Sequence, residues 1–285
     1  MDVPRLAGIA FDVLSLSSIL VLLVLGMGII VSMMGIFNLA HGELVLLGAF
    51  TVYLAHKVGL GVGLGIVLAP IVVGAAGLLL ERSVVRHFYS RPISALLATW
   101  AVGMMIRESV RAGLHGRSEV VVAPFSGTFA IGNVYLSQWR VAIVLLTVAV
   151  IAASYLLLQR TRVGLQVRAT LDNASLARAS GIATGRVYAL TFAFGSALAG
   201  LAGALIVPLF ALYADLGVTF LVRSFLAVMV GGVGSFEGPI LGAGAVGLGS
   251  GVLPWVVAPV LADALVFVIA IALMRFMPNG LVHRG

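Results

Sequence analysis

The chain has 285 residues, of which 61% are hydrophobic and only 9% are charged, and its mean hydropathy is +1.19. Soluble domains carry about 25% charged residues, so this composition excludes a water-soluble globular domain and predicts an all-α, polytopic transmembrane helical bundle. The net charge of +7 does not indicate nucleic-acid binding, because the arginines cluster in connecting segments rather than on one face. The absence of cysteine excludes disulfides and thiolate metal sites.

Apolar runs long enough to cross ~30 Å of hydrocarbon recur along nearly the whole sequence. In chain order they cover residues 13–34, 38–56, 62–80, 93–112, 141–158, 187–213, 220–233, 240–253 and 256–277. The run that begins at Asn38 is either a full span or a re-entrant piece, which gives eight or nine spans in one domain of residues 1–285. Residues 118–138 are polar and show a short β-like alternation, so we expect an external excursion there.

Arginines are concentrated in three connecting or terminal segments. One cluster runs from Arg82 to Arg91, the second lies within residues 159–186, and the third includes Arg275 near the C-terminus. The positive-inside rule places all three clusters, and therefore the C-terminus, in the cytoplasm. Residues 159–186 combine this charge with a helix-forming composition, so we expect them to present a short helix to a soluble partner.

No motif for catalysis or nucleotide binding is present in the sequence. The single lysine, Lys57, follows no glycine-rich loop, so a P-loop is absent and any ATP hydrolysis belongs to another chain. A G-x-G-x-x-G pattern begins at Gly242, but it lies inside an apolar helix, where close helix packing is the favoured interpretation. Metal-ligand spacings and a nucleophile elbow are also missing. We therefore expect neither an enzyme nor a metal or cofactor on this chain.

Polar residues inside the predicted spans are the candidates for a solute path. Asn38, His41 and Glu43 either line that path, or form a hinge at a broken helix, or mark a helix start with Asn38 as its N-cap. Thr99 and Trp100 interrupt an aliphatic run. They belong either to an aromatic belt at the membrane interface or to the lining of the path.

A glycine-containing break near residue 235 resembles the break before His41. HGELVLLGA (41–49) and FEGPILGA (236–243) share a Glu ahead of Gly-Ala, which is either chance or a pair of interrupted helices of the kind that marks transporter sites. Ser235 and Glu237 lie in this turn, and Glu237 either caps the helix from Pro239 or contacts a partner. Two ion pairs are expected as structural features, Glu108 with Arg111 and Asp263 with Arg223.

Four motifs point to one family. They are IFNLAHGELVLLGAF (36–50), GLQVRATLDNASLARASGI (164–182), FLAVMVGGVGSFEGPILGA (225–243) and MPNGL (277–281). Together they resemble the permeases of branched-chain amino acid ABC importers over nearly the whole chain. LLATWAVG (96–103) is similar to the branch of that family associated with urea or short amides.

The resemblance implies one permease domain of a heteromeric importer in the bacterial inner membrane. A second homologous permease, two P-loop ATPase subunits that hold ATP and Mg, and a periplasmic solute-binding protein would complete it. The family's coupling helix falls on residues 171–181, with Asp172 as its cap. The residues that would contact the ATPase are Arg168, Leu171, Asp172, Leu176, Arg178, Ala179 and Gly181. Two alternatives stay open at this point: an interfacial helix on anionic lipid for this segment, and an ATP-independent channel or secondary transporter for the whole chain.

Overall fold

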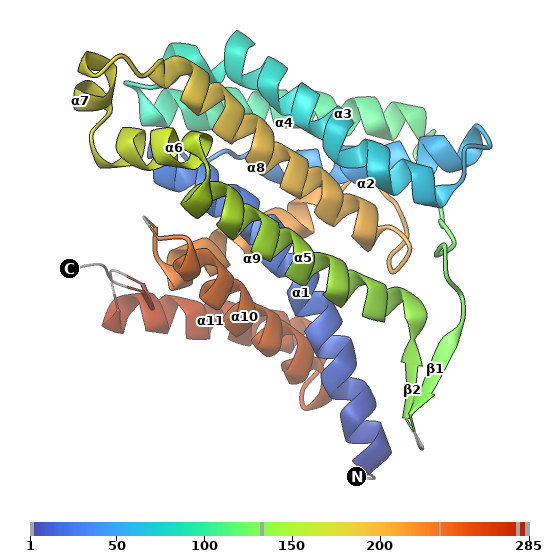
Figure 1. Ribbon diagram of the computed structural model, residues 1–285. Coiled ribbons are helices and arrows are strands. Elements are labelled where there is room, and N and C mark those ends of the chain that lie inside the picture. Colours follow the sequence, from blue (N-terminus) through green and yellow to red (C-terminus); the bar gives the residue numbers. More distant parts are fainter. Residues whose placement is uncertain (1–2, 132–133, 234, 278–279, 283–285) are drawn as a thin grey trace.

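A computed structural model of the protein describes residues 3–131, 134–233, 235–277 and 280–282. Nine helices of these residues form one bundle (Figure 1). They are α1 (Val3–Met34), α2 (His41–Lys57), α3 (Val62–Ser83), α4 (Pro92–Gly113), α5 (Gln138–Arg160), α8 (Thr184–Ile206), α9 (Leu216–Gly231), α10 (Glu237–Val252) and α11 (Pro259–Phe276). The predicted polytopic all-α fold is confirmed.

Helices α1 and α8 form the centre of the bundle, and α3, α4 and α5 lie outside them (Figure 1). In their most apolar stretches, 83% of the residues of α1 and 72% of those of α8 are buried, against 17–28% for the three outer helices. The outer helices are nevertheless strongly apolar, so most of their exposed surface suits lipid rather than water, apart from the charged end of α4. Five described helices (α1, α3, α4, α5 and α8) are long and apolar enough to cross a membrane, and the other four have 16 to 18 residues.

Close packing at the centre depends on glycine. A Cβ atom at Gly203 of α8 would lie 1.9 Å from the backbone oxygen of Val45 in α2. A Cβ atom at Gly48 of α2 would in turn lie 2.2 Å from the backbone oxygen of Gly200. Only small residues allow two helix backbones to approach so closely, and the resulting dispersion attraction replaces the hydrophobic effect, which lipid does not supply.

Most expected spans appear with ends shifted by a few residues, but α8 is much shorter at its C-terminal end than the run 187–213 predicted. It ends at Ile206 because Pro208 lacks an amide hydrogen and its ring would clash with the preceding helical turn. The chain after Pro208 leaves the helix axis, and Leu212 exchanges backbone hydrogen bonds with Glu119. This bridge fastens the connection between α8 and α9 to the long connection between α4 and α5.

The two ends of the bundle differ in structure. At the hairpin end, β1 (Thr128–Ile131) and β2 (Val134–Ser137) pair antiparallel and account for the alternation expected within residues 118–138. At the opposite end, here named the α7 end, the helices α6 (Arg162–Asp172) and α7 (Ala174–Ala179) project from the bundle (Figure 1). A short 3-10 helix, η1 (Val85–Phe88), connects α3 to α4, and another, η2 (Leu253–Trp255), follows α10.

Candidate functional site

The connection between α1 and α2 is a non-helical segment held by polar side chains. Gly35 adopts a φ of +62°, which turns the chain away at the end of α1. Asn38 Oδ1 then accepts a hydrogen bond from the amide of Ala40 at 3.0 Å. The amide of Leu39 donates to Thr99 Oγ1 of α4 at 3.2 Å. The backbone amides of Ala40 and Leu39 at this break are therefore hydrogen-bonded, the first by a side chain of the same segment and the second by a neighbouring helix.

Helix α2 begins inside the bundle rather than at the end of α1. Nε2 of the buried His41 donates to the backbone oxygen of Leu23 at 3.0 Å. Leu23 lies roughly 17 Å along α1 from Met34, at ~1.5 Å per residue. The N-cap position of α2 is Ala40, which makes no side-chain cap, so the expectation that Asn38 is the N-cap was wrong. Asn38 instead closes a turn three residues before the first residue of α2.

Glu43, in the first turn of α2, is ion-paired with Arg107 of α4. Arg107 donates from Nε to Glu43 Oε1 at 3.0 Å and from Nη2 to the same oxygen. The side chain of Glu43 is only 1% exposed and that of Arg107 is 21% exposed. Two glycines make room for the carboxylate, since a Cβ at Gly103 would lie 3.3 Å from Glu43 Cγ and one at Gly217 would lie 2.9 Å from Oε2.

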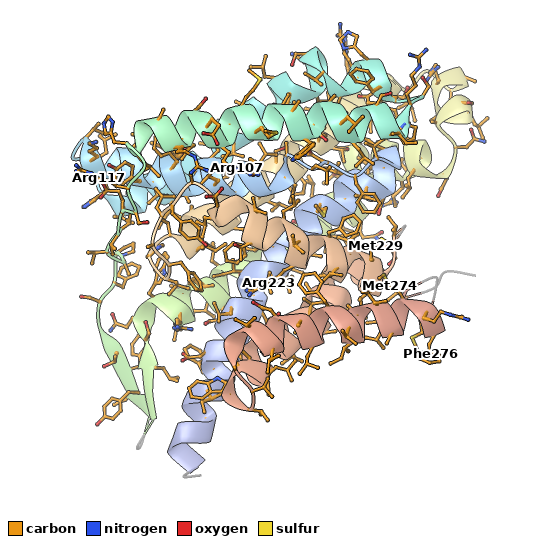
Figure 2. The ribbon with its side chains drawn as sticks, turned by 180° about the vertical axis from the view of Figure 1, so that it is seen from behind. Arg107, Arg117, Arg223, Met229, Met274 and Phe276 are labelled. Carbon is orange, nitrogen blue, oxygen red and sulfur yellow. The ribbon has the colours of Figure 1, made fainter. Side chains whose placement is uncertain are left out.

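The ion pair continues outward as a series of alternating charges. Arg107 Nη1 lies 4.0 Å from Asp215 Oδ1, just before α9. Asp215 also accepts from Arg111 Nη2 at 3.1 Å, and Arg111 Nε lies 3.1 Å from Glu108 Oε2, which confirms the predicted Glu108–Arg111 pair. Figure 2 shows Arg107 between α4 and α2, at the hairpin end of the bundle. The charges thus lead from the buried Glu43 to the surface.

The polar junction (Asn38, His41, Glu43, Thr99 and Arg107) contains four of the five residues predicted to line a solute path. Those four are buried in this chain, whereas Trp100, the fifth, is about half exposed on α4. Sequence reasoning missed the partners of Glu43. The available signal was that an acid within a span requires a basic or polar partner.

At the α7 end, α6 is fastened to the end of α5. Thr161 caps α6 by accepting a hydrogen bond from the amide of Gly164 at 3.1 Å. Arg168 donates to the backbone oxygen of Leu158 and to Gln159 Oε1 at 3.2 Å. Arg168 therefore satisfies the backbone carbonyl of Leu158 in the last turn of α5 and ties α6 to that helix.

Helix α7 is a short, separately capped element. Asn173, not Asp172, is its N-cap, because Asn173 Oδ1 accepts from the amide of Leu176 at 2.9 Å while Asp172 is the last residue of α6. The predicted cap at Asp172 was therefore wrong by one residue. Gly181 closes the other end with a φ of +85°, a conformation that a side chain disfavours.

The residues predicted to contact an ATPase lie largely on the surface of this end. The side chain of Leu176 is 65% exposed, and Leu171 is also exposed. Ala179 and Gly181 are exposed as well. Arg178 is exposed and its Nε donates to Thr184 Oγ1 at 3.4 Å, which directs it back toward the start of α8.

The turn between α9 and α10 also lies at the α7 end. Ser235 Oγ accepts from the amide of Gly238 at 2.9 Å, so Ser235 satisfies the start of α10 and the cap predicted at Glu237 was wrong. Glu237 is exposed instead. The C-terminal segment packs on this turn, where the amide of Leu281 donates to the backbone oxygen of Val230 at 2.9 Å. The predicted pair between α9 and α11 is confirmed, with Arg223 Nη2 2.9 Å from Asp263 Oδ1.

A cleft at the α7 end separates α6 from this turn. Its volume is about 90 Å³, and α1, α5, α6 and the turn before α10 line it. Leu171 and Arg168 form one wall, and Phe236 forms the other. Phe236 also packs against Tyr155 of α5, with ring centroids 5.9 Å apart. The cleft leaves α6 free space on the side that faces α10.

Tyr89, in the connection after η1, joins α3 and α8 at the same end. Its hydroxyl donates to the buried Glu81, and its ring meets the edge of Tyr188 with centroids 5.1 Å apart. Burial, reinforced by the carboxylate of Glu81, raises the pKa of Tyr89 well above its ordinary value. Tyr89 therefore remains a neutral donor at all physiological pH values.

Comparison with known proteins agrees with this architecture. The family model described as branched-chain amino acid transport system / permease component matches residues 9–274. The high-affinity branched-chain amino acid transport system permease protein LivH of Escherichia coli K12 is 24% identical, over 96% of this chain and 94% of its own length. BraD of Pseudomonas aeruginosa, which has the same description, is 25% identical over 95% and 94%.

A further similar protein is found in another organism. A probable branched-chain amino acid transport permease protein, LivH of Methanocaldococcus jannaschii, is 24% identical over 93% of this chain and 89% of its own length. No solved structure matches the chain. The family match covers nearly all of the bundle, and the family is one of transport permeases rather than of enzymes. The chain belongs to the permease components of branched-chain amino acid transport systems.

Proposed function

We propose that the protein is one of two homologous permease subunits of an ATP-driven importer in the bacterial inner membrane. Two P-loop ATPase subunits that bind ATP and Mg would dock at the α7 end, and a periplasmic solute-binding protein would dock at the hairpin end. The proposed cargo is a branched-chain or related amino acid, as the names of the similar permeases suggest. This chain would form half of the path and carry out no covalent step.

The observation that carries this proposal is the exposed α7. An apolar side chain that is 65% exposed at the tip of a projecting, separately capped helix has no partner within the described part of the chain. Short helices of this kind bind by inserting apolar side chains into a groove of a partner protein. Leu176 would fill that groove, with Leu171 and Ala179 beside it and Arg178 at its rim.

The connection from α7 to the bundle suggests how the ATPases would drive transport. A force on α7 reaches α6 through Asn173, and it reaches α5 through the bonds of Arg168 to the last turn of that helix. The cleft beside Phe236 gives α6 room to move. We therefore propose that closure of the ATPase pair tilts α5 and α6, and that this movement opens the path alternately to the two sides.

The charge distribution supports the orientation. Arg160, Arg162, Arg168, Arg178 and Arg186 all lie in or next to α6 and α7. Under the positive-inside rule the α7 end would be cytoplasmic, and the end of α11 with it. The start of α1 would lie on the outside, because Asp12 is ion-paired at 3.3 Å with Arg140 next to the β-hairpin.

Leu176→Asp tests the docking of the ATPases. The control is Val120→Asp, which places the same charge on an exposed apolar residue at the hairpin end. In membranes that contain the whole importer, a cysteine introduced at Ser180 should cross-link to an ATPase subunit. Leu176→Asp should reduce this cross-link and ATP-dependent leucine uptake at least about tenfold, the effect of losing a buried apolar anchor. Val120→Asp should preserve the cross-link.

Two results would contradict the proposal. Equal cross-linking in the two variants would show that Leu176 does not seat in an ATPase. Leucine uptake by the reconstituted wild-type chain without ATP and without partner subunits would instead identify a channel or secondary transporter.

A further inference from the structure

We propose that Arg107, Asp215 and the exposed stripe of α4 beside them form a binding station for a zwitterionic amino acid in the transport path. The solute carboxylate binds Arg107 Nη1, its ammonium group binds Asp215, and its apolar side chain lies on Met104 and Trp100. This inference rests on the proposed importer function and adds the residues that recognise the solute.

One nitrogen of Arg107, Nη1, makes only a long ion pair with the protein. Its Nε and Nη2 atoms both donate to Glu43 Oε1. In the described part of the chain Nη1 makes no hydrogen bond, and the 4.0 Å that separate it from Asp215 Oδ1 exceed hydrogen-bond length. Because Glu43 is fully buried and packed between Gly103 and Gly217, it fixes the guanidinium rather than competing for Nη1.

The opposite charge required for an ammonium group is available beside Nη1. Asp215 is 54% exposed, and its carboxylate is held by Arg111 at 3.1 and 3.3 Å. A guanidinium and a carboxylate at this separation match the two charges of an amino acid, which form charge-assisted hydrogen bonds with them. A neutral amide or urea cannot satisfy both groups with ionic partners, so the pair favours a zwitterion.

The surface proposed to hold the solute side chain follows from the periodicity of α4. Trp100, Met104, Arg107 and Arg111 are spaced by four, three and four residues, which places them on one face of the helix. Trp100 and Met104 are each about half exposed there. An apolar surface directly beside the charged groups fits an amino acid with a branched aliphatic side chain better than a small polar solute.

The position of the station in the fold agrees with this role. It lies where α2 begins inside the bundle, and where α9 begins against it, with Gly42 and Gly217 in close backbone contact. Interrupted helices that start inside the membrane are typical of transporter binding sites. A purely structural tie between α2 and α4 requires Glu43 and Arg107 only. It does not require Asp215, which is exposed.

The test is uptake of radiolabelled L-leucine by proteoliposomes that contain the complete importer, saturated with its binding protein. Asp215→Asn is compared with Glu108→Gln, which removes the other exposed carboxylate that pairs with Arg111 and lies outside the proposed station. Asp215→Asn should lower the maximal rate of leucine uptake about tenfold, which corresponds to the loss of one charge-assisted hydrogen bond. The leucine concentration that gives half-maximal uptake should stay unchanged. Glu108→Gln should stay within about twofold of wild type.

A second pair of variants separates binding from folding. The double variant Glu43→Gln with Arg107→Gln removes the station's cation without leaving a buried carboxylate alone. It should be incorporated normally and transport at least about tenfold more slowly. Met104→Asn should reduce uptake more than Met105→Asn, the adjacent methionine on another face of α4.

The outcomes separate a failure of the proposed importer function from a failure of the binding station. If wild-type proteoliposomes show no ATP-dependent leucine uptake, the proposed function fails. If wild type transports leucine and both Asp215→Asn and the double variant keep its maximal rate, the station is wrong while the proposed function stands. A rate of the Glu43→Gln/Arg107→Gln variant that falls equally for leucine and for leucinol, which keeps the ammonium group but lacks the carboxylate, would also refute the assignment of Arg107 to the solute carboxylate.

Discussion

Gly203→Ala should separate α8 from α2 and destabilise the centre of the bundle. The added methyl group would lie 1.9 Å from Val45 O, 2.8 Å from Val45 C and 3.0 Å from the amide nitrogen of Ala49. All three atoms belong to the backbone, so no side-chain rotation relieves the clash. The two helices must move apart by about 1.5 Å to restore ordinary contact distances.

The size of the effect follows from overpacking and from weaker dispersion attraction between the two helices. Overpacking a close-packed interior costs about 1–3 kcal/mol. Moving α8 away from α2 also weakens the attraction between their facing atoms, to which each atom pair contributes about 0.1–0.2 kcal/mol. We therefore expect the free energy of unfolding to fall by about 3 kcal/mol, equivalent to a midpoint of thermal unfolding about 6–12 °C lower.

The matched control is Gly185→Ala in the same helix. A Cβ atom at Gly185 meets no atom within 4 Å, so this change should be neutral or stabilising by less than about 1 kcal/mol. Thermal unfolding in detergent, followed by tryptophan fluorescence, measures both variants, since the chain has three tryptophans. If Gly203→Ala unfolds within about 1 °C of Gly185→Ala, the reasoning from backbone contact is refuted.

Two predictions concern the α7 end. Asn173→Ala removes the N-cap of α7 and should destabilise that helix by about 1 kcal/mol, seen as faster amide hydrogen exchange at Leu176, while Asp172→Ala should leave this exchange unchanged. Gly181→Pro combined with Arg178→Glu removes the left-handed turn and reverses the charge at the helix end, so it should abolish transport without reducing the amount of protein in the membrane. Wild-type uptake by the double variant would remove the coupling role from this helix.

The helices of the bundle could be predicted because their signal is local. A run of apolar residues long enough for the bilayer identifies a span without knowledge of its neighbours. Glycine and proline then limit the ends, although Pro208 terminated α8 earlier than the apolar run suggested. The β-hairpin in residues 118–138 was likewise visible as a local alternation.

The helix caps were predicted only approximately, because neighbouring residues compete for the same position. Asp172 and Asn173 both have side chains that cap helices. Asn173 is the cap because it has the extended backbone that the position requires, with φ −156° and ψ 99°. In the same way, Ser235 rather than Glu237 reaches the free amide at the start of α10.

The charged cluster of Glu43, Arg107, Arg111 and Asp215 could not be derived from the sequence because its members are far apart in the chain. Glu43 and Arg107 are separated by 64 positions, and Arg111 and Asp215 by 104. Spacing along a helix identifies only partners three or four residues away, which is why Glu108–Arg111 was predicted and Glu43–Arg107 was missed. Gly103 and Gly217 leave space for the Glu43 side chain, and this role becomes apparent only once the helices are packed together.

The central claim is that this chain works as half of an ATP-driven importer. The most direct test is to purify the tagged protein from native membranes in mild detergent, identify every protein that accompanies it, and reconstitute the complex for uptake. The claim predicts a second homologous permease, two P-loop ATPases, and leucine uptake that requires ATP and the binding protein. A lone chain or pure homo-oligomer that moves solute without ATP would contradict it.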